Sequence, residues 1–114
     1  MILVVGAMQE EINDIYKQKD EDFDLLLTGI GKVNAAMKLS QYLAQYKPDL
    51  ILNIGFAGGN IAYHVNDIVL IDKVFYHDFD LSLFGYKKGQ VPGFPEYFQT
   101  PQKLYEKINT HIPN

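Results

Sequence analysis

The sequence of 114 residues contains no cysteine and no arginine, and each absence excludes a class of sites. Without cysteine the chain cannot form a disulfide, use a thiolate nucleophile or bind zinc through sulfur. All ten of its basic residues are lysines, so it lacks the guanidinium fork that binds phosphate through two parallel hydrogen bonds. A function that depends on gripping phosphate is therefore disfavoured.

Long apolar runs are also absent. The opening run, Met1 to Val5, has no basic flank before it and an acidic stretch after it, so we expect neither a signal peptide nor a membrane span. The formal net charge is -4 and the lysines are scattered, which argues against a nucleic-acid partner. With 47% hydrophobic residues, the chain is expected to form a single cytoplasmic domain over residues 1–114.

Three apolar runs are each followed by a glycine-bearing turn, and helical spacing follows the first two. The runs predict buried strands at Ile2–Val5, Phe23–Thr28 and Asp49–Gly55. Helices are predicted from Met8 to Tyr16 and over Lys32–Tyr46, the second with Val33, Ala36, Met37, Ser40 and Ala44 on one face. This order predicts an α/β fold with a mixed, largely parallel central sheet flanked by helices, whose three glycine turns lie together at the carboxyl ends of the strands.

The second half of the sequence has a different character. Ile68–Asp78 has the composition of a longer strand, and the glycines, prolines and aromatic residues of Leu81–Phe98 predict a long ordered loop. A final helix is expected after Thr100, with Thr100 as N-cap and Pro101 in the first position.

The stretch GAMQEEI, Gly6 to Ile12, places two adjacent glutamates where the first strand gives way to a helix. A helical wheel puts Glu11 at the border of the apolar arc, and Glu10 on the far side with Asp14; the arc comprises Met8, Ile12, Ile15 and Tyr16. The helix dipole favours the carboxylate of Glu11 and partial burial disfavours it, a setting suited to a general acid or base. The alternative is that both acids only complement the helix dipole.

Other patterns are less specific. The turns TGIGK and GFAGG could cradle an anion through backbone N–H groups, or could serve only as tight turns, and neither matches a phosphate-binding fingerprint. In an extended segment His77 points away from Asp78 and Asp80, so no metal site is expected. The aromatic loop could cover the core or pack against a second copy of the chain.

Five segments in the same order resemble the amino-terminal half of the 5′-methylthioadenosine/S-adenosylhomocysteine nucleosidases, a family of the purine nucleoside phosphorylase superfamily. The segments are GAMQEE, TGIGKVNAA, KPDLILNIGFAGG, VNDIVLIDKVFYHDFD and FGYKKGQVPGFP. The resemblance covers nearly the whole chain. It implies a nucleoside phosphorylase-like fold and hydrolysis of the N-glycosidic bond of a thionucleoside, which releases adenine without a cofactor, in a cytoplasmic homodimer.

The resemblance also implies roles for individual residues. Glu11 matches the glutamate that holds and activates the attacking water, and Ala7, Met8 and Ile30 match residues that line the substrate pocket. Phe56, Ala57 and Gly58 lie in the turn beside the ribose. Phe84 and Pro92 match a loop that covers the alkylthio group of the substrate in the partner subunit.

The sequence departs from the family at three points. GFAGG stands where the family has GSAGG, so the ring of Phe56 replaces a small hydroxyl residue, and the segment before TGIGK is shorter. The family's second half, with an acidic ribose clamp and an aspartate that protonates adenine, is not matched. We therefore expect the chain alone to be weakly active or inactive. A non-catalytic, dimerising or binding homologue is the alternative, and a phosphate-dependent phosphorylase is disfavoured by the lack of arginine.

Overall fold

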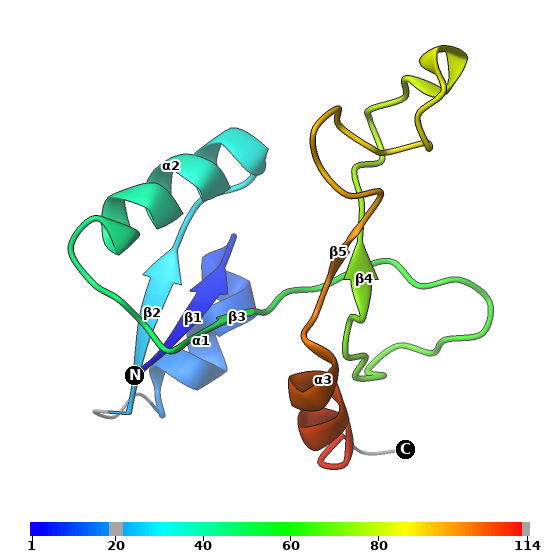
Figure 1. The fold of residues 1–114 in the computed structure, drawn as a ribbon. Coiled ribbons are helices and arrows are strands. Elements are labelled where there is room, and N and C mark those ends of the chain that lie inside the picture. Colours follow the sequence, from blue (N-terminus) through cyan, green and yellow to red (C-terminus); the bar gives the residue numbers. More distant parts are fainter. Residues whose placement is uncertain (19–21, 113–114) are drawn as a thin grey trace. The chain divides into compact units, whose positions relative to one another are not determined.

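The structure is a computed structural model that describes residues 1–18 and 22–112. The chain divides into two compact units, which are described separately: unit 1, Met1–Gly59, and unit 2, Asn60–Asn114. Unit 1 contains β1 (Ile2–Gly6), α1 (Gln9–Tyr16), β2 (Phe23–Leu27), α2 (Lys32–Leu43) and β3 (Leu50–Asn53). Unit 2 contains β4 (Lys73–Val74), the 3-10 helix η1 (Ser82–Phe84), β5 (Phe98–Gln99) and α3 (Gln102–Asn109) (Figure 1).

Unit 1 is built on a parallel sheet of order β2-β1-β3. Ile2 of the central strand pairs with Phe23 on one side and with Leu50 on the other, so the three strands run in register from the same edge. The first crossover runs from β1 to β2, and the second runs in the opposite direction, from β2 past β1 to β3. Because such crossovers are right-handed, α1 and α2 lie on opposite sides of the sheet (Figure 1). The predicted α/β fold with a parallel sheet is thereby confirmed.

The core of unit 1 is centred on β1. Leu3 is completely buried, and Val4, Val5 and Ile12 are also buried. The continuous aliphatic run of β1 suits this position, because a central parallel strand with helices above and below has no solvent face. Ile12 supplies the contact from α1, while Met8 and Ile15 are half-buried and Tyr16, predicted to lie in the same apolar arc, is exposed.

The apolar face that the sequence predicts for α2 is exposed in the structure. Val33 and Met37 are exposed, and no residue of α2 is buried. Leu39 and Tyr42, three positions apart on another face, are the half-buried side chains of this helix. The helix also ends at Leu43, before the predicted Tyr46. The alanine-rich composition thus predicted the helix correctly, but the apolar spacing did not predict which face of the helix is covered.

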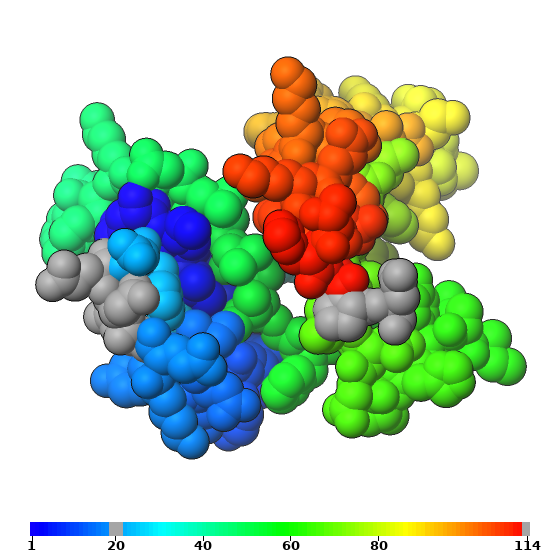
Figure 2. Space-filling view, turned by 90° about the horizontal axis from the view of Figure 1, so that it is seen from below, coloured from blue at the N-terminus to red at the C-terminus, as the bar shows by residue number. Residues whose placement is uncertain are grey.

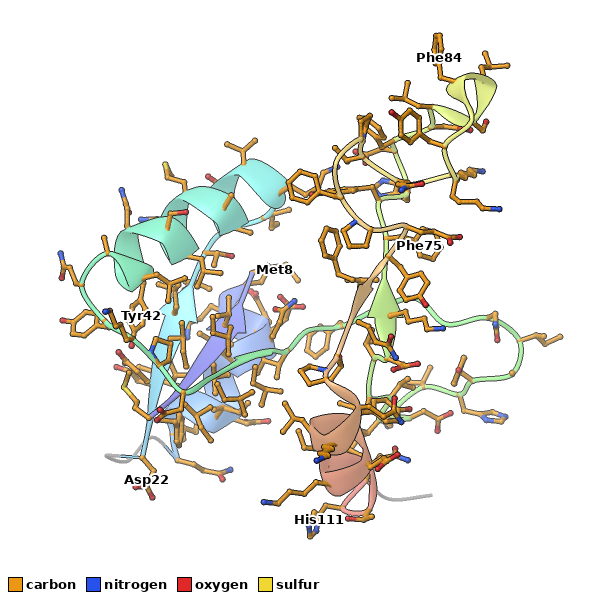
Figure 3. All side chains as sticks on the ribbon, in the orientation of Figure 1. Met8, Asp22, Tyr42, Phe75, Phe84 and His111 are labelled. Atoms are coloured by element: carbon orange, nitrogen blue, oxygen red, sulfur yellow. The ribbon has the colours of Figure 1, made fainter. Side chains whose placement is uncertain are left out.

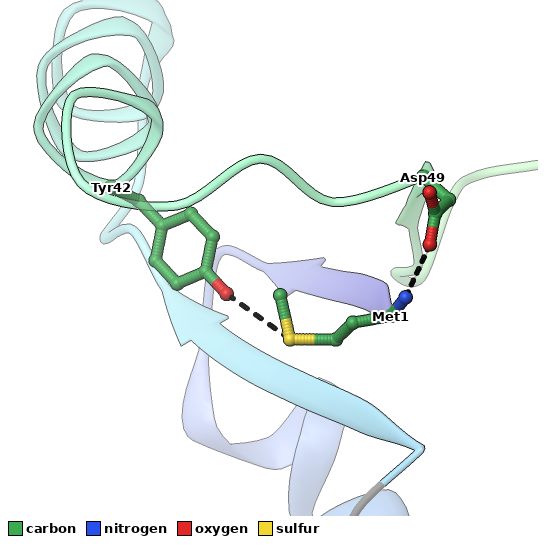
Figure 4. A network of polar contacts seen from close by, with 3 residues as sticks. All are labelled: Met1, Tyr42 and Asp49. Carbon is green, nitrogen blue, oxygen red and sulfur yellow. Dashed lines mark hydrogen bonds and ion pairs between the residues drawn. The ribbon is translucent and has the colours of Figure 1, made fainter.

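A polar network joins the three strands at the edge of the sheet where they begin (Figure 4). The Met1 ammonium group pairs with the carboxylate of Asp49, and the Asp49 N–H donates to the Met1 carbonyl at 2.9 Å. The Tyr42 hydroxyl donates to Asp24 Oδ2 at 3.0 Å and lies 3.8 Å from Met1 Sδ. Burial, this hydrogen bond and the negative charge of Asp24 raise the pKa of Tyr42 to about 12.

In unit 2 the strand predicted over Ile68–Asp78 is reduced to β4. Lys73 pairs with Gln99 and Val74 with Phe98 in an antiparallel ladder of two residue pairs. Apolar residues of the segment, such as Ile68 and Ile71, are exposed. The composition favoured a strand, but a strand also needs a partner, and β5 supplies one for only two residues.

The remaining predictions for unit 2 were confirmed in part. Residues 81–97 form a loop with η1 and a succession of turns, held for example by the Gly89 N–H donating to the Phe79 carbonyl at 2.8 Å, and Phe98 begins β5. The final helix α3 exists, and it lies at the surface at the red end of the chain (Figure 2). Its N-cap is Pro101, not Thr100, whose hydroxyl donates to the Ile71 carbonyl at 2.9 Å.

Candidate functional site

The carboxyl ends of the three parallel strands bring the glycine turns of unit 1 to one edge of the sheet. Thr28 N–H donates to the Gly6 carbonyl and Ile54 N–H to the Val5 carbonyl, each at 2.9 Å. The turns that begin at Gly6, Gly29 and Gly55 are therefore neighbours, as predicted. Ligands of α/β proteins bind at this edge, so it is the candidate site.

Glu11 links two of these turns. It lies in the first turn of α1 and is half-buried. The Met8 N–H donates to Oε1 at 3.0 Å, and the Phe56 N–H donates to Oε2 at 2.7 Å. Both carboxylate oxygens are thus fixed by backbone groups, one that follows β1 and one that follows β3. Glu10 is exposed, so the predicted difference between the two glutamates is confirmed in their burial.

The turn after β2 is held from both sides by side chains that the sequence analysis did not single out. The buried Thr28 hydroxyl donates to the Gly29 carbonyl at 2.8 Å, and Asn34 Nδ2 donates to the Ile30 carbonyl at 2.8 Å. Gly29 and Gly31 have positive φ angles of 85° and 99°. The sequence signal for this arrangement is a G-x-G turn with a polar residue before it and another after it, each able to donate to a backbone carbonyl of the turn.

Most predicted substrate-binding residues lie along this edge. Ala7 and Met8 follow β1 and are half-buried, and Figure 3 shows Met8 at the end of that strand. Ile30 is exposed in the turn after β2. Phe56, Ala57 and Gly58 follow β3 and are exposed, with 72% of Phe56 accessible to solvent. Unit 1 therefore brings these residues to the same edge as Glu11.

The two remaining predicted residues belong to unit 2. Phe84 ends η1 and its ring points outward at the tip of the loop (Figure 3). Pro92 is exposed in a turn of the same loop. Both residues of this loop, called the exposed arm below, are therefore open to solvent within unit 2.

Residues 1–18 and 22–112 contain no group of three or more His, Cys, Asp or Glu side chains that could hold a metal ion. Asp80, one of the acids weighed as a ligand, accepts the Ser82 N–H at 2.9 Å, and its hydrogen bonding with Ser82 lowers the pKa of the Asp80 carboxyl. No helix in the same residues is long and apolar enough to cross a membrane.

Comparison with known proteins gives consistent matches. Residues 24–112 match the profile of the phosphorylase superfamily. The 5′-methylthioadenosine/S-adenosylhomocysteine nucleosidase of Staphylococcus aureus strain MRSA252 is 36% identical over 129 aligned residues, which cover 96% of this chain and 57% of the relative. The chain thus spans little more than half the length of the curated relatives it matches.

Solved structures agree with this result. A Borrelia burgdorferi B31 protein, described as a nucleosidase of the same kind and bound to adenine, matches with a TM-score of 0.88 and 36% identity, covering 96% of this chain and 57% of its own. The Neisseria meningitidis nucleosidase in complex with methylthio-immucillin-A matches with a TM-score of 0.84 and 31% identity, covering 96% and 56%. The fold described above is therefore found in proteins solved with adenine or with methylthio-immucillin-A.

Proposed function

This chain belongs to the phosphorylase superfamily, and on that premise we propose that it takes part in hydrolysis of the N-glycosidic bond of 5′-methylthioadenosine or S-adenosylhomocysteine. The products are adenine and the corresponding thioribose, and the reaction uses no cofactor. The names of the relatives and the adenine and methylthio-immucillin-A bound in two of them support this substrate class. The chain matches 57% of the length of the S. aureus relative, so its own activity has to be measured.

The position of Glu11 is the observation that carries the proposal. Its carboxylate lies at the ligand-binding edge of the sheet, with Oε1 bound by Met8 N–H and Oε2 by Phe56 N–H. A carboxylate has about four lone-pair sites, so each oxygen can accept a further hydrogen bond. A water molecule that donates to Glu11 would be oriented by a group that is itself fixed on both sides.

The proposed step has Glu11 as general base. As the bond between C1′ of the ribose and N9 of adenine breaks, the water oxygen bonds to C1′ and a water proton passes to the Glu11 carboxylate. The electron pair of the broken bond leaves with adenine, which needs a proton from a general acid. The family resemblance assigns that acid to an aspartate that no residue of this chain matches. We therefore propose that Glu11 supplies one half of an acid/base pair.

The neighbouring residues are proposed to hold the nucleoside. Ala7, Met8 and Ile30 surround the edge at which Glu11 lies, and their side chains suit the apolar parts of the sugar and the thioether. Phe56 is held by the same bond that fixes Glu11, so we propose that its ring packs close to the ribose. Ala57 and Gly58 complete the turn and let the substrate approach the backbone.

Water is the proposed acceptor in preference to phosphate. A phosphorylase must bind phosphate beside the ribose, and arginine is well suited to that task because its fork matches the geometry of phosphate oxygens. All ten basic residues of this chain are lysines. Added phosphate is therefore expected to leave the rate of adenine release unchanged.

We also propose that the protein works as a cytoplasmic homodimer. The exposed arm that carries Phe84 and Pro92 suits a role in covering the alkylthio group of a substrate bound in the second copy. Light scattering should give twice the mass of the chain, and Phe84→Ser should weaken that association. A monomeric protein that releases adenine at full rate would contradict this part of the proposal.

Adenine release from 5′-methylthioadenosine tests the function directly. The protein would be compared with Glu11→Gln, which keeps the shape of the side chain but lacks the base, and adenine would be quantified by chromatography. We expect Glu11→Gln to lower the rate about 10²- to 10⁴-fold, the usual contribution of general acid/base catalysis. Undiminished release by this variant would remove Glu11 from the mechanism.

Glu10→Gln is the matched control. Glu10 is adjacent in the sequence and exposed, so its substitution makes the same change in charge away from the site. Equal losses in the two variants would indicate an effect of net charge and would contradict the assignment to Glu11. Release of no adenine by the unaltered protein would contradict the proposed hydrolysis.

A further inference from the structure

Gly55 faces the carboxylate of Glu11 across the end of β3. A methyl group built on the Gly55 backbone would overlap Oε2 of Glu11 and lie 3.3 Å from its Cδ. Among the described residues other than its neighbours Ile54 and Phe56, no other residue comes within 3.4 Å of that methyl position. The carboxylate thus occupies the space that a side chain at position 55 would need.

Backbone conformation gives no separate reason for glycine at this position. The φ angle of Gly55 lies outside the left-handed range, in contrast to Gly29 and Gly31, which have positive φ. A left-handed φ therefore does not explain the glycine at this position. The close contact that a larger residue would meet here is with the Glu11 side chain.

We propose that Gly55 is a positioning residue, which sets the Glu11 carboxylate for the hydrolysis proposed above by leaving room for it beside the Phe56 N–H. An alanine at position 55 would force Oε2 away from this space. Because the Phe56 N–H is on the next residue, the carboxylate would lose its 2.7 Å bond to that group. It would also be drawn away from the Met8 N–H, which holds the other oxygen.

A double-mutant cycle on stability tests the steric part of the proposal without any need for activity. Urea unfolding would be measured for the unaltered protein, Gly55→Ala, Glu11→Ala and the double variant. Gly55→Ala should lower the urea midpoint when Glu11 is present. Glu11→Ala removes the overlap. In that background Gly55→Ala should leave the urea midpoint unchanged or raise it, because alanine reduces the conformational freedom of the unfolded chain.

Gly58→Ala is the control for the general effect of alanine in this turn. Apart from its two chain neighbours, no atom of the described residues lies within 4 Å of a methyl group at Gly58, and its φ is also outside the left-handed range. Its urea midpoint should change little in either background. An equal loss on Gly55→Ala with and without Glu11 would overturn the proposal, as would failure of the double variant to fold.

Amide chemical shifts test the displacement of the carboxylate itself. In the ¹H–¹⁵N spectrum, Gly55→Ala should move the amide signals of Phe56 and Met8 toward their positions in Glu11→Ala. A substitution that only loosened the fold would not reproduce the shifts of that particular variant. Signals of Phe56 and Met8 that stay at their original positions in Gly55→Ala would overturn the proposal.

The kinetic effect separates this proposal from the proposed function. If the protein releases adenine, Gly55→Ala should lower kcat by more than tenfold and change KM by less than threefold, because the water is misplaced while the nucleoside pocket remains. An unchanged kcat would overturn the role in positioning. If no variant releases adenine, the proposed hydrolysis fails, and the stability cycle and amide shifts still decide whether Gly55 makes room for Glu11.

Discussion

The carboxylate of Glu11 and the backbone N–H of Phe56 form a 2.7 Å hydrogen bond, although the two residues lie 45 positions apart in the sequence. The bond connects the first turn of α1 to the segment that follows β3. The same carboxylate oxygens are those proposed to orient water. Substitutions at this edge are therefore expected to change stability as well as activity, and the two have to be measured together.

Ile12→Ala should strongly destabilise unit 1. Ile12 is the buried residue of α1, with 3% of its surface exposed, and it contacts the end of β1 near Gly6. We expect a loss of about 2–5 kcal/mol in the free energy of unfolding, measured with urea, because the substitution leaves a cavity. Ile15→Ala, at a half-buried position of the same helix, should cost clearly less.

Thr28→Val should show how much the hydroxyl at the end of β2 contributes. Valine keeps the shape of the buried side chain but cannot donate to the Gly29 carbonyl. The expected loss is about 1–3 kcal/mol in urea unfolding, since a partly buried acceptor loses its donor. Thr28→Ser retains the hydroxyl and removes only a methyl group. A larger loss for serine than for valine would assign the role of Thr28 to packing.

Gly31→Ala should destabilise the protein through backbone strain alone. Gly31 has φ 99° and ψ 155° as the N-cap of α2. In the part of the chain that the structure describes, no atom outside its two chain neighbours lies within 4 Å of a methyl group built there. Because other residues rarely adopt this conformation, we expect a loss of about 1–3 kcal/mol. Gly58→Ala, which is equally open but has no positive φ, should change the free energy of unfolding by less than about 0.5 kcal/mol.

The pKa of Tyr42 predicts a dependence of stability on alkaline pH. Burial and the hydrogen bond to Asp24 raise the pKa of Tyr42 from 10.0 to about 12 in the folded protein. A raised pKa stabilises the fold fully below pH 10 and loses this contribution as the pH approaches about 12. Over that range, the free energy of unfolding should fall more steeply in the unaltered protein than in Tyr42→Phe.

Two controls accompany this measurement. Tyr46 lies against Tyr42 with ring centroids 4.8 Å apart and is exposed. Tyr46→Phe keeps the ring contact and removes only the smallest of the causes that raise the pKa of Tyr42, so it should change the alkaline slope less than Tyr42→Phe does. Absorbance titration of tyrosinate should show one group that ionises near pH 12 and is lost in Tyr42→Phe. Identical pH slopes for Tyr42→Phe and the unaltered protein would contradict the role of the Asp24 hydrogen bond.

The strands of unit 1 could be predicted because each is marked by residue type. The run Ile2–Val5 is aliphatic throughout, as a strand covered on both faces requires, and Gly6 ends it. The edge at which the glycine turns meet followed from the direction of parallel strands. The central place of β1 was not predicted, because the order β2-β1-β3 depends on pairings between distant segments.

Helix faces and short strands were harder to predict. In α2, alanines and long side chains occur on several faces, so periodicity did not identify Leu39 and Tyr42 as the half-buried positions. In Ile68–Asp78, residue type favours a strand, but only Lys73 and Val74 are paired. Tyr16, the last residue of α1, has the spacing of Ile12 yet is exposed.

The sequence predicted Glu11 as a candidate site residue, but it did not predict the hydrogen bonds that hold the Glu11 carboxylate. Glu11 was selected from its place at the border of an apolar face, and the structure confirms that it is half-buried. Its bond to the Phe56 N–H was not predictable, because backbone donors have no residue-type signature. The requirement for a bare backbone at Gly55 follows from that bond, and it becomes visible only when both turns are placed in space.

The central position of β1 has a consequence for the order in which this edge is assembled. During synthesis, β1 can pair with β2 as soon as Phe23 has emerged, but it must wait for Leu50 before β3 can join. Closing the longer loop costs more chain entropy. The hydrogen bond from the Met8 N–H to Glu11 can therefore form early, within one helix turn. The bond from the Phe56 N–H to Glu11 can form only when β3 pairs with β1. The Phe56 amide is therefore suited to report when β3 joins the sheet.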